Sequence, residues 1–223
     1  MASISSKFLE FLNPSRVLII LYIVGFFGVT IPIHEDFMLL TPVNLLTTFF
    51  IALYADKNKN TALYLALLLC YVFGLVIELI GVHNEFLFGK YAYGATLGTK
   101  IFDTPLIIGI NWAMLVYAST SFTNKYFKSY NLLIKSALGA LIMVSLDILI
   151  EPVAVNYDFW TWSNPPINKL IVAPLQNYIT WYLAAFLLNI LFHKLAPRTQ
   201  NNVIELLFIL QMLFFAWINL FVI

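Results

Sequence analysis

Long apolar runs of 17 to 21 residues alternate with short polar turns along most of the chain. A helix rises about 1.5 Å per residue, so each run is long enough to cross the roughly 30 Å hydrocarbon core of a bilayer. The pattern predicts seven membrane-spanning helices, over residues 14–31, 38–54, 61–80, 105–122, 132–151, 174–192 and 203–223. No small-residue cleavage site follows the first run, and we therefore expect a retained span rather than a signal peptide.

Two stretches between these runs, residues 81–104 and 152–173, are rich in aromatic residues and show no sustained period. We expect both to be irregular. Irregular backbone cannot face lipid, because its polar groups would lack hydrogen-bond partners. Both segments are therefore expected to lie against the protein at headgroup depth, on the same side of the membrane.

Composition agrees with a membrane protein, because 61% of the 223 residues are hydrophobic and only 10% are charged, against about 25% charged in a soluble domain. The fold class expected is all-α: a polytopic membrane bundle in a single domain, residues 1–223. Lys and Arg total 12 against 11 acidic residues, so no positive excess favours a nucleic acid partner. The single cysteine, Cys70, is read as a small core residue.

Positive residues are unequally divided between the two predicted sides. The side of the N-terminus holds nine of the twelve Lys and Arg residues, whereas the other side holds Lys90, Lys100 and Lys169. The positive-inside rule therefore places the N-terminus in the cytoplasm and the C-terminus outside.

Several polar residues are expected at one depth in the outer half of the membrane. Asp147 and Glu151 are four residues apart and share one helix face. Glu78 lies in the last turn of the third predicted span, and His83 and Asn177 are expected at the same level. A charge at the centre of a span costs roughly 2.5 to 3.5 kcal/mol, so such residues usually face an interior site and have a function there.

This group of residues could form a site for acid–base catalysis. Like charges close together in a low-dielectric environment disfavour each other, so we expect Asp147 or Glu151 to hold a proton and act as an acid beside a base. Aromatic faces can stabilise a carbocation by about 0.5 to 2 kcal/mol each. The candidates are Tyr91, Tyr93, Trp160 and Trp162.

A structural interpretation of the same residues stays open. Glu78 is also expected to form an ordinary interfacial ion pair with Lys90 or Lys100, and Trp160 and Trp162 fit an interfacial aromatic belt equally well. Glu151, at the edge of its span before Pro152, fits a solvated carboxylate, and His83 fits a loop cap.

Other chemistry is disfavoured by missing residue types. Three histidines are too few for a membrane di-iron enzyme, the last two predicted spans lack a central lysine for retinal, and no glycine-rich phosphate loop follows a strand. We expect no metal and no cofactor, which leaves acid–base catalysis or a carrier.

Three segments together resemble a known family. They are ELIGVHNEFLFGKYAYGATLGTKIFDTPL (78–106), LDILIEPVAVNYDFWTW (146–162) and APLQNYITWYL (173–183). In order and spacing they resemble the integral-membrane carotenoid hydratases, such as the γ-carotene 1′,2′-hydratases and the bisanhydrobacterioruberin hydratases. The resemblance covers residues 71–195, and Leu79 and Glu151 stand where relatives often have Trp and Asp.

The resemblance implies addition of water across the terminal 1,2 double bond of an acyclic carotenoid end group, giving a tertiary alcohol. It implies Asp147 as general acid, Glu151 and Glu78 as base and counter-charge, and His83 as an orienting residue. Tyr91, Tyr93, Trp160, Trp162 and Asn177 would bind the substrate. Further implications are a lycopene- or γ-carotene-like substrate, water, a bacterial or archaeal cell membrane and other carotenoid-pathway enzymes as partners.

Two alternatives remain at this point. A carotenoid end-group cyclase begins with the same protonation but excludes water. A carotenoid- or lipid-binding membrane subunit would perform no chemistry at all.

Overall fold

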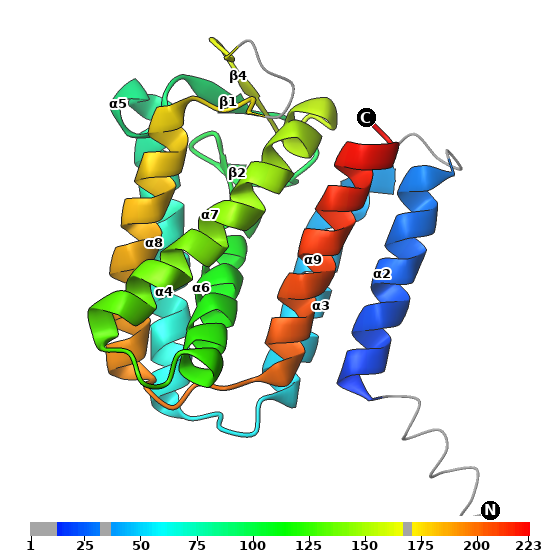
Figure 1. Cartoon of the computed structure of the whole chain (residues 1–223). Coiled ribbons are helices and arrows are strands. Elements are labelled where there is room, and N and C mark those ends of the chain that lie inside the picture. Colours follow the sequence, from blue (N-terminus) through cyan, green and yellow to red (C-terminus); the bar gives the residue numbers. More distant parts are fainter. Residues whose placement is uncertain (1–12, 32–36, 167–170) are drawn as a thin grey trace, which may run out of the picture.

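Seven long helices make up most of the computed structural model, which describes residues 13–31, 37–166 and 171–223. They are α2 (Pro14–Thr30), α3 (Thr41–Ala55), α4 (Thr61–His83), α6 (Ile107–Tyr126), α7 (Leu132–Asn156), α8 (Leu175–Leu195) and α9 (Asn202–Phe221). A 3-10 turn, η1 (Phe37–Leu40), precedes α3. The helices form one bundle in which α2 begins and α9 ends at opposite ends (Figure 1).

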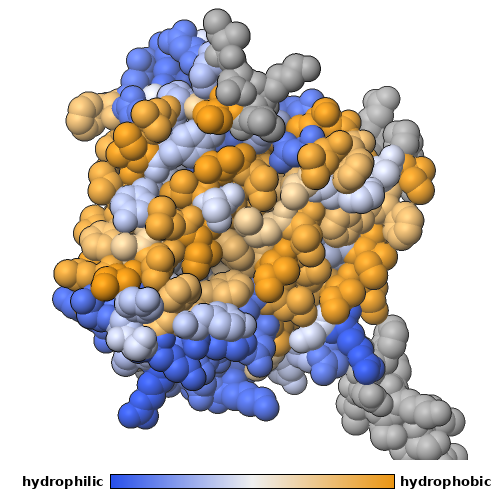
Figure 2. Space-filling model, in the orientation of Figure 1, coloured by the Kyte–Doolittle hydropathy of each residue, from blue (hydrophilic) through white to orange (hydrophobic). Residues whose placement is uncertain are grey.

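Asparagine caps start four of these helices at one end of the bundle. Asn13, Asn60, Asn131 and Asn201 accept backbone N–H groups in the first turns of α2, α4, α7 and α9. Each cap satisfies an N–H that has no partner within its own helix. The lysine-bearing turns lie at this same end, which is largely hydrophilic, below a broad apolar band (Figure 2).

The structure supports a helical membrane bundle with five candidate spans among the described residues. Five stretches within the described chain are long and apolar enough to cross a membrane: residues 37–55, 61–83, 132–156, 175–195 and 202–221. Helix α2 has only 17 residues. Helix α6 is long enough but more polar, and 15 of its 20 residues are buried, because neighbouring helices rather than lipid surround it. Seven spans therefore remain a prediction.

The expected boundary at Pro152 was wrong. Helix α7 continues through Pro152 to Asn156, and the amide of Tyr157 still bonds to the carbonyl of Val153 at 3.0 Å. Proline removes one hydrogen bond and its ring crowds the carbonyl one turn earlier, but packing on neighbouring helices can offset this cost and the helix need not end there. Glu151 consequently lies within the helix rather than at its edge.

The two segments expected to be irregular contain short regular elements. Helix α4 extends to His83, and the segments hold α5 (Glu85–Phe88), β1 (Tyr91–Tyr93), β2 (Lys100–Ile101), β3 (Thr104–Pro105) and β4 (Trp160–Trp162). Strand β1 pairs with β4 in antiparallel register, and β2 pairs with β3. Sequence periodicity missed these strands because two or three residues are too few to show a period.

The β1–β4 pair places four aromatic residues together above the bundle. Tyr91 lies opposite Trp162 and Tyr93 opposite Trp160. Residues that face each other across an antiparallel pair project to the same side, and alternate residues project to the other side. Tyr91, Tyr93, Trp160 and Trp162 therefore share one face, which we call the aromatic cap, while Ala92 and Thr161 are exposed on the opposite face.

Gly94, directly after β1, allows the chain to pass close to Asp158, shortly before β4. A Cβ at this position would lie 2.1 Å from the backbone oxygen of Asp158. The Gly94 amide bonds to the Phe159 carbonyl at 2.9 Å, and the Asp158 carboxylate accepts the amide of Ala95 at 2.9 Å. The side chain of any other residue would push the two segments apart.

We predict that Gly94→Val lowers the free energy of unfolding by about 1–3 kcal/mol, the usual cost of overpacking. Unfolding by SDS in mixed micelles, followed by tryptophan fluorescence, measures this change. Ala92→Val is the matched control, because Ala92 is an exposed residue of β1, two positions before Gly94. Equal stability of the two variants would contradict the close approach of Gly94 to Asp158.

Candidate active site

Glu78 accepts hydrogen bonds from three aromatic side chains. The hydroxyls of Tyr91 and Tyr93 donate to Oε2 at 2.7 and 2.8 Å, and the indole N–H of Trp112 donates to Oε1 at 3.1 Å. Trp112 comes this close because α4 has Gly74 one turn earlier, where a Cβ would lie 2.4 Å from the Trp112 side chain. Glu78 is 3% exposed, so these donors take the place of water around its carboxylate.

Helix α7 brings the other two carboxylates to the same place. Glu151 Oε2 accepts the indole N–H groups of Trp160 at 3.1 Å and Trp162 at 2.8 Å. The Asn177 amide on α8 donates both to Glu151 Oε1 and to Asp147 Oδ2, each at 3.2 Å. Glu151 thus has three donors, whereas the Asn177 amide is the single hydrogen-bond donor found for Asp147 in the described structure.

Basic side chains are engaged elsewhere. Lys90 pairs with Glu85 at 3.0 Å, and Lys100 donates to the Tyr93 carbonyl at 2.6 Å. Within the described residues, none of the ion pairs involves Glu78, Asp147 or Glu151. The interpretation of Glu78 as an interfacial partner of Lys90 or Lys100 is therefore wrong.

The tyrosines of the aromatic cap remain proton donors. Burial raises the pKa of Tyr91 and of Tyr93, and the neighbouring charge of Glu78 raises both further. Both hydroxyls consequently keep their protons at physiological pH and donate to Glu78. A carboxylate that accepts such bonds is stabilised in its ionised form.

A small cavity separates the three carboxylates. It measures about 30 Å³, which is room for one or two water molecules. Besides the three acids, the aromatic cap and Asn177, its wall contains Phe88, Ile108, Asn111, Ile150 and Trp181.

Eight of the nine site residues predicted from the sequence line this one cavity: Glu78, Tyr91, Tyr93, Asp147, Glu151, Trp160, Trp162 and Asn177. Their convergence does not establish their roles, which remain predictions. His83 is not among them, because its ring lies 3.0 Å from the carbonyl of Leu79 and 3.7 Å from the carboxylate of Asp103, outside the cavity. At position 83 the chain is one turn beyond Glu78 and already at the surface.

Three residues of the site, Asn111, Trp112 and Trp181, were not predicted from the sequence. Trp112 and Trp181 stack with ring centroids 4.2 Å apart, and both are buried. Trp181 and Asn111 line the cavity, whereas Trp112 reaches the site through its hydrogen bond to Glu78. The available signal was Asn111, a polar residue early in an apolar run, since polar groups inside spans usually face a cavity.

We predict that Trp112→Phe, which keeps a stacked ring but removes the N–H donor to Glu78, lowers the free energy of unfolding by about 1–3 kcal/mol. The control is Trp217→Phe, whose lost bond to Thr30 Oγ1, 2.9 Å long, is exposed and should cost less than about 1 kcal/mol. SDS titration in mixed micelles compares them. Similar small losses in both variants would contradict a buried hydrogen bond to Glu78.

Residues 40–223 match the sequence family described as carotenoid biosynthesis protein. A curated relative, the bisanhydrobacterioruberin hydratase of Haloarcula japonica, is 27% identical over 146 residues, which cover 60% of this chain and 45% of the relative. The chain thus matches less than half the length of that relative. No solved structure matches the chain. The family match spans most of the sequence, and we conclude that this chain belongs to the carotenoid biosynthesis protein family.

Proposed function

We propose that this protein hydrates the terminal 1,2 double bond of an acyclic carotenoid end group to a tertiary alcohol. The observation that carries the proposal is the unequal hydrogen bonding of three neighbouring carboxylates. Glu78 and Glu151 each accept three donors, whereas Asp147 accepts one. Donors stabilise the ionised form, so the proton of the group belongs on Asp147.

This arrangement suits proton addition to an alkene. Asp147 gives its proton to C2, which leaves the positive charge on tertiary C1, the more stable cation. A water molecule in the cavity attacks C1 through its oxygen, and one of its protons passes to Glu151 or Glu78. Because Asp147 and Glu151 bond to the same Asn177 amide, a proton on Glu151 is next to Asp147 and can return to it. In the overall reaction, one alkene and one water molecule give one alcohol.

The aromatic cap has two roles in this scheme. The ring faces of Tyr93 and Trp160, which lie 6.0 Å apart edge to face, offer electron density to the carbocation. The polar edges of the cap hold Glu78 and Glu151 in place. These residues and the carboxylates supply every group that the reaction needs, so the proposal involves neither a metal nor a cofactor.

The relative named as a hydratase supports this choice over its alternatives. A cyclase would have no use for a polar, water-sized cavity next to the acid. A carrier without chemistry would not require three buried acidic side chains, which are costly to place inside a membrane bundle.

We predict that expression in a lycopene-producing bacterial host yields pigment heavier by one water, and that Asp147→Asn lowers this yield at least about 100-fold. Glu78→Gln and Glu151→Gln should also lower it. His83→Ala, whose side chain is outside the cavity, should retain activity and serves as the control. Mass analysis of extracted pigments measures the products at matched protein levels.

Two outcomes would contradict the proposal. A pigment changed in structure but not in mass would indicate a cyclase. Full hydroxylation by all three carboxylate variants would indicate that the acids are not catalytic and would favour a carrier.

The proposed setting is a bacterial or archaeal cell membrane, with the aromatic cap on the outer side. This orientation rests on the nine-to-three distribution of Lys and Arg; of these residues, Lys7 and Lys169 lie outside the described structure. Substrate would then reach the site laterally from the bilayer. Other enzymes of carotenoid synthesis are the expected partners.

Orientation is testable by cysteine labelling, since Cys70 is buried and gives little background. We predict that a membrane-impermeant maleimide labels Phe102→Cys on intact cells and leaves Ser129→Cys unlabelled until the cells are opened. Both positions are exposed, one near the cap and one in the turn between α6 and α7. The reverse pattern would place the aromatic cap in the cytoplasm.

A further inference from the structure

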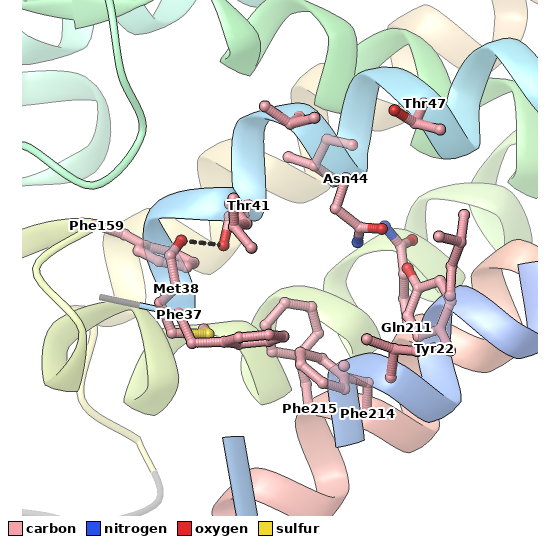
Figure 3. A pocket seen from close by; sticks show the side chains of 16 residues that line it. Tyr22, Phe37, Met38, Thr41, Asn44, Thr47, Phe159, Gln211, Phe214 and Phe215 are labelled. Atoms are coloured by element: carbon pink, nitrogen blue, oxygen red, sulfur yellow. Dashed lines mark hydrogen bonds between the residues drawn. The ribbon is translucent and has the colours of Figure 1, made fainter. Parts of the chain in front are cut away.

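A second, larger cavity lies between α2, η1, α3 and α9. It measures about 250 Å³ and its wall is mostly apolar (Figure 3). None of the carboxylates described above lines it. The space is close in size to small-molecule sites, which usually combine an apolar wall with a few polar groups that orient the ligand.

The mouth of this cavity is apolar and exposed. Val24, Leu40 and Val43 line the cavity and are 55%, 55% and 61% exposed. Val24 belongs to α2, whose visible surface is part of the apolar band (Figure 2), and Leu40 and Val43 are exposed apolar residues of η1 and α3. A ligand that enters past these side chains therefore comes from the hydrocarbon phase of the membrane.

A polar group of three residues lies inside this apolar wall. Tyr22 on α2 neighbours the amides of Asn44 on α3 and Gln211 on α9, and Figure 3 shows the two amides directed toward each other beside the cavity. Gln211 is 3% exposed, and its Oε1 has no hydrogen-bond partner within the described structure. A buried acceptor without a donor is costly, and a polar residue in the middle of a span usually marks a binding site.

The rest of the wall suits a flat, conjugated chain. Phe37, Phe214 and Phe215 gather at one side of the cavity (Figure 3). Phe159 closes another side, and its ring centroid lies 6.2 Å from that of Trp160 in the aromatic cap. The cavity and the carboxylate site are thus separated by two adjacent aromatic residues of one segment.

We propose that this cavity binds the hydroxylated end of an acyclic carotenoid, with its hydroxyl donating to Gln211 Oε1 and the rest of the polyene chain extending through the apolar mouth into the bilayer. The inference rests on the proposed function, because a hydroxylated carotenoid is the product of that reaction. The apolar mouth favours a molecule that is dissolved in the membrane. The aromatic wall favours a conjugated molecule, and the unpartnered acceptor favours one that carries a hydroxyl group. The cavity is then a site where product is held beside the catalytic centre.

Binding is measured on protein that carries Asp147→Asn, so that lycopene is not hydrated during the experiment. Purified full-length protein in detergent is incubated with lycopene or 1-hydroxylycopene, free pigment is removed by gel filtration, and bound pigment is quantified by its visible absorbance. We expect this protein to bind the hydroxylated pigment about tenfold more tightly than lycopene, and the addition of Gln211→Leu to abolish this preference, as expected for one hydrogen bond.

A pair of variants on α3 tests the location. Val43→Trp fills the mouth and should reduce binding of 1-hydroxylycopene at least about tenfold. Leu46→Trp is the matched control, because Leu46 is exposed on the same helix but does not line the cavity. Equal binding of both pigments by the Asp147→Asn protein, or equal binding of 1-hydroxylycopene by the two tryptophan variants, would overturn the inference.

The inference and the proposed function are tested on different forms of the protein: hydration is measured on wild type, and the binding preference on Asp147→Asn. If the cavity binds product, Asp147→Asn prefers 1-hydroxylycopene to lycopene. If hydration fails in every form of the protein while this preference persists, only the proposed reaction is wrong. If hydration proceeds and the preference is absent, only the cavity assignment is wrong.

Discussion

Replacement of water by protein donors around three buried carboxylates is the constraint on which the upper half of this structure depends. Glu78 and Glu151 can be buried because tyrosine hydroxyls, indole N–H groups and an asparagine amide point at them. These donors come from α6, α8 and the β1–β4 pair, so each of these elements must be held in register with α4 and α7. The cap is aromatic for the same reason, since Tyr and Trp join a polar edge to an apolar body.

The opposite end of the bundle is fixed by a separate polar network. The Asn201 amide donates to the Ala52 carbonyl and to the Tyr117 hydroxyl, each at 2.8 Å, and Tyr117 donates to Asp56. Glu205 accepts from Ser121 and pairs with Lys125, each at 2.7 Å. These bonds join α3, α6 and α9. Helix α6 also contributes Trp112 to the carboxylate site, so it takes part in the polar networks at both ends of the bundle.

Much of this architecture could be predicted from the sequence because its causes are local. The apolar runs located the helices, and the spacing of Asp147 and Glu151 placed both on one face of α7. The resemblance to carotenoid hydratases is confirmed by the family match.

The pairing of Tyr91 with Trp162 could not be predicted, because it joins short strands about 70 residues apart in sequence and depends on how the helices pack. The position of His83 was missed because helix α4 continues one turn further than expected. Gln211 and Asn44 drew no prediction, because they are far apart in the sequence, and only the structure brings them together at a cavity.

The central claim is that the three carboxylates share one proton and that Asp147 holds it. Infrared spectroscopy of the purified protein tests this claim most directly, because a protonated carboxylic acid has its own carbonyl stretch, separate from the bands of carboxylates, which shifts in heavy water. The account predicts one such band from a buried acid at neutral pH, lost in Asp147→Asn and kept in Glu78→Gln and Glu151→Gln. A band that survives in Asp147→Asn and disappears in either glutamate variant would contradict it.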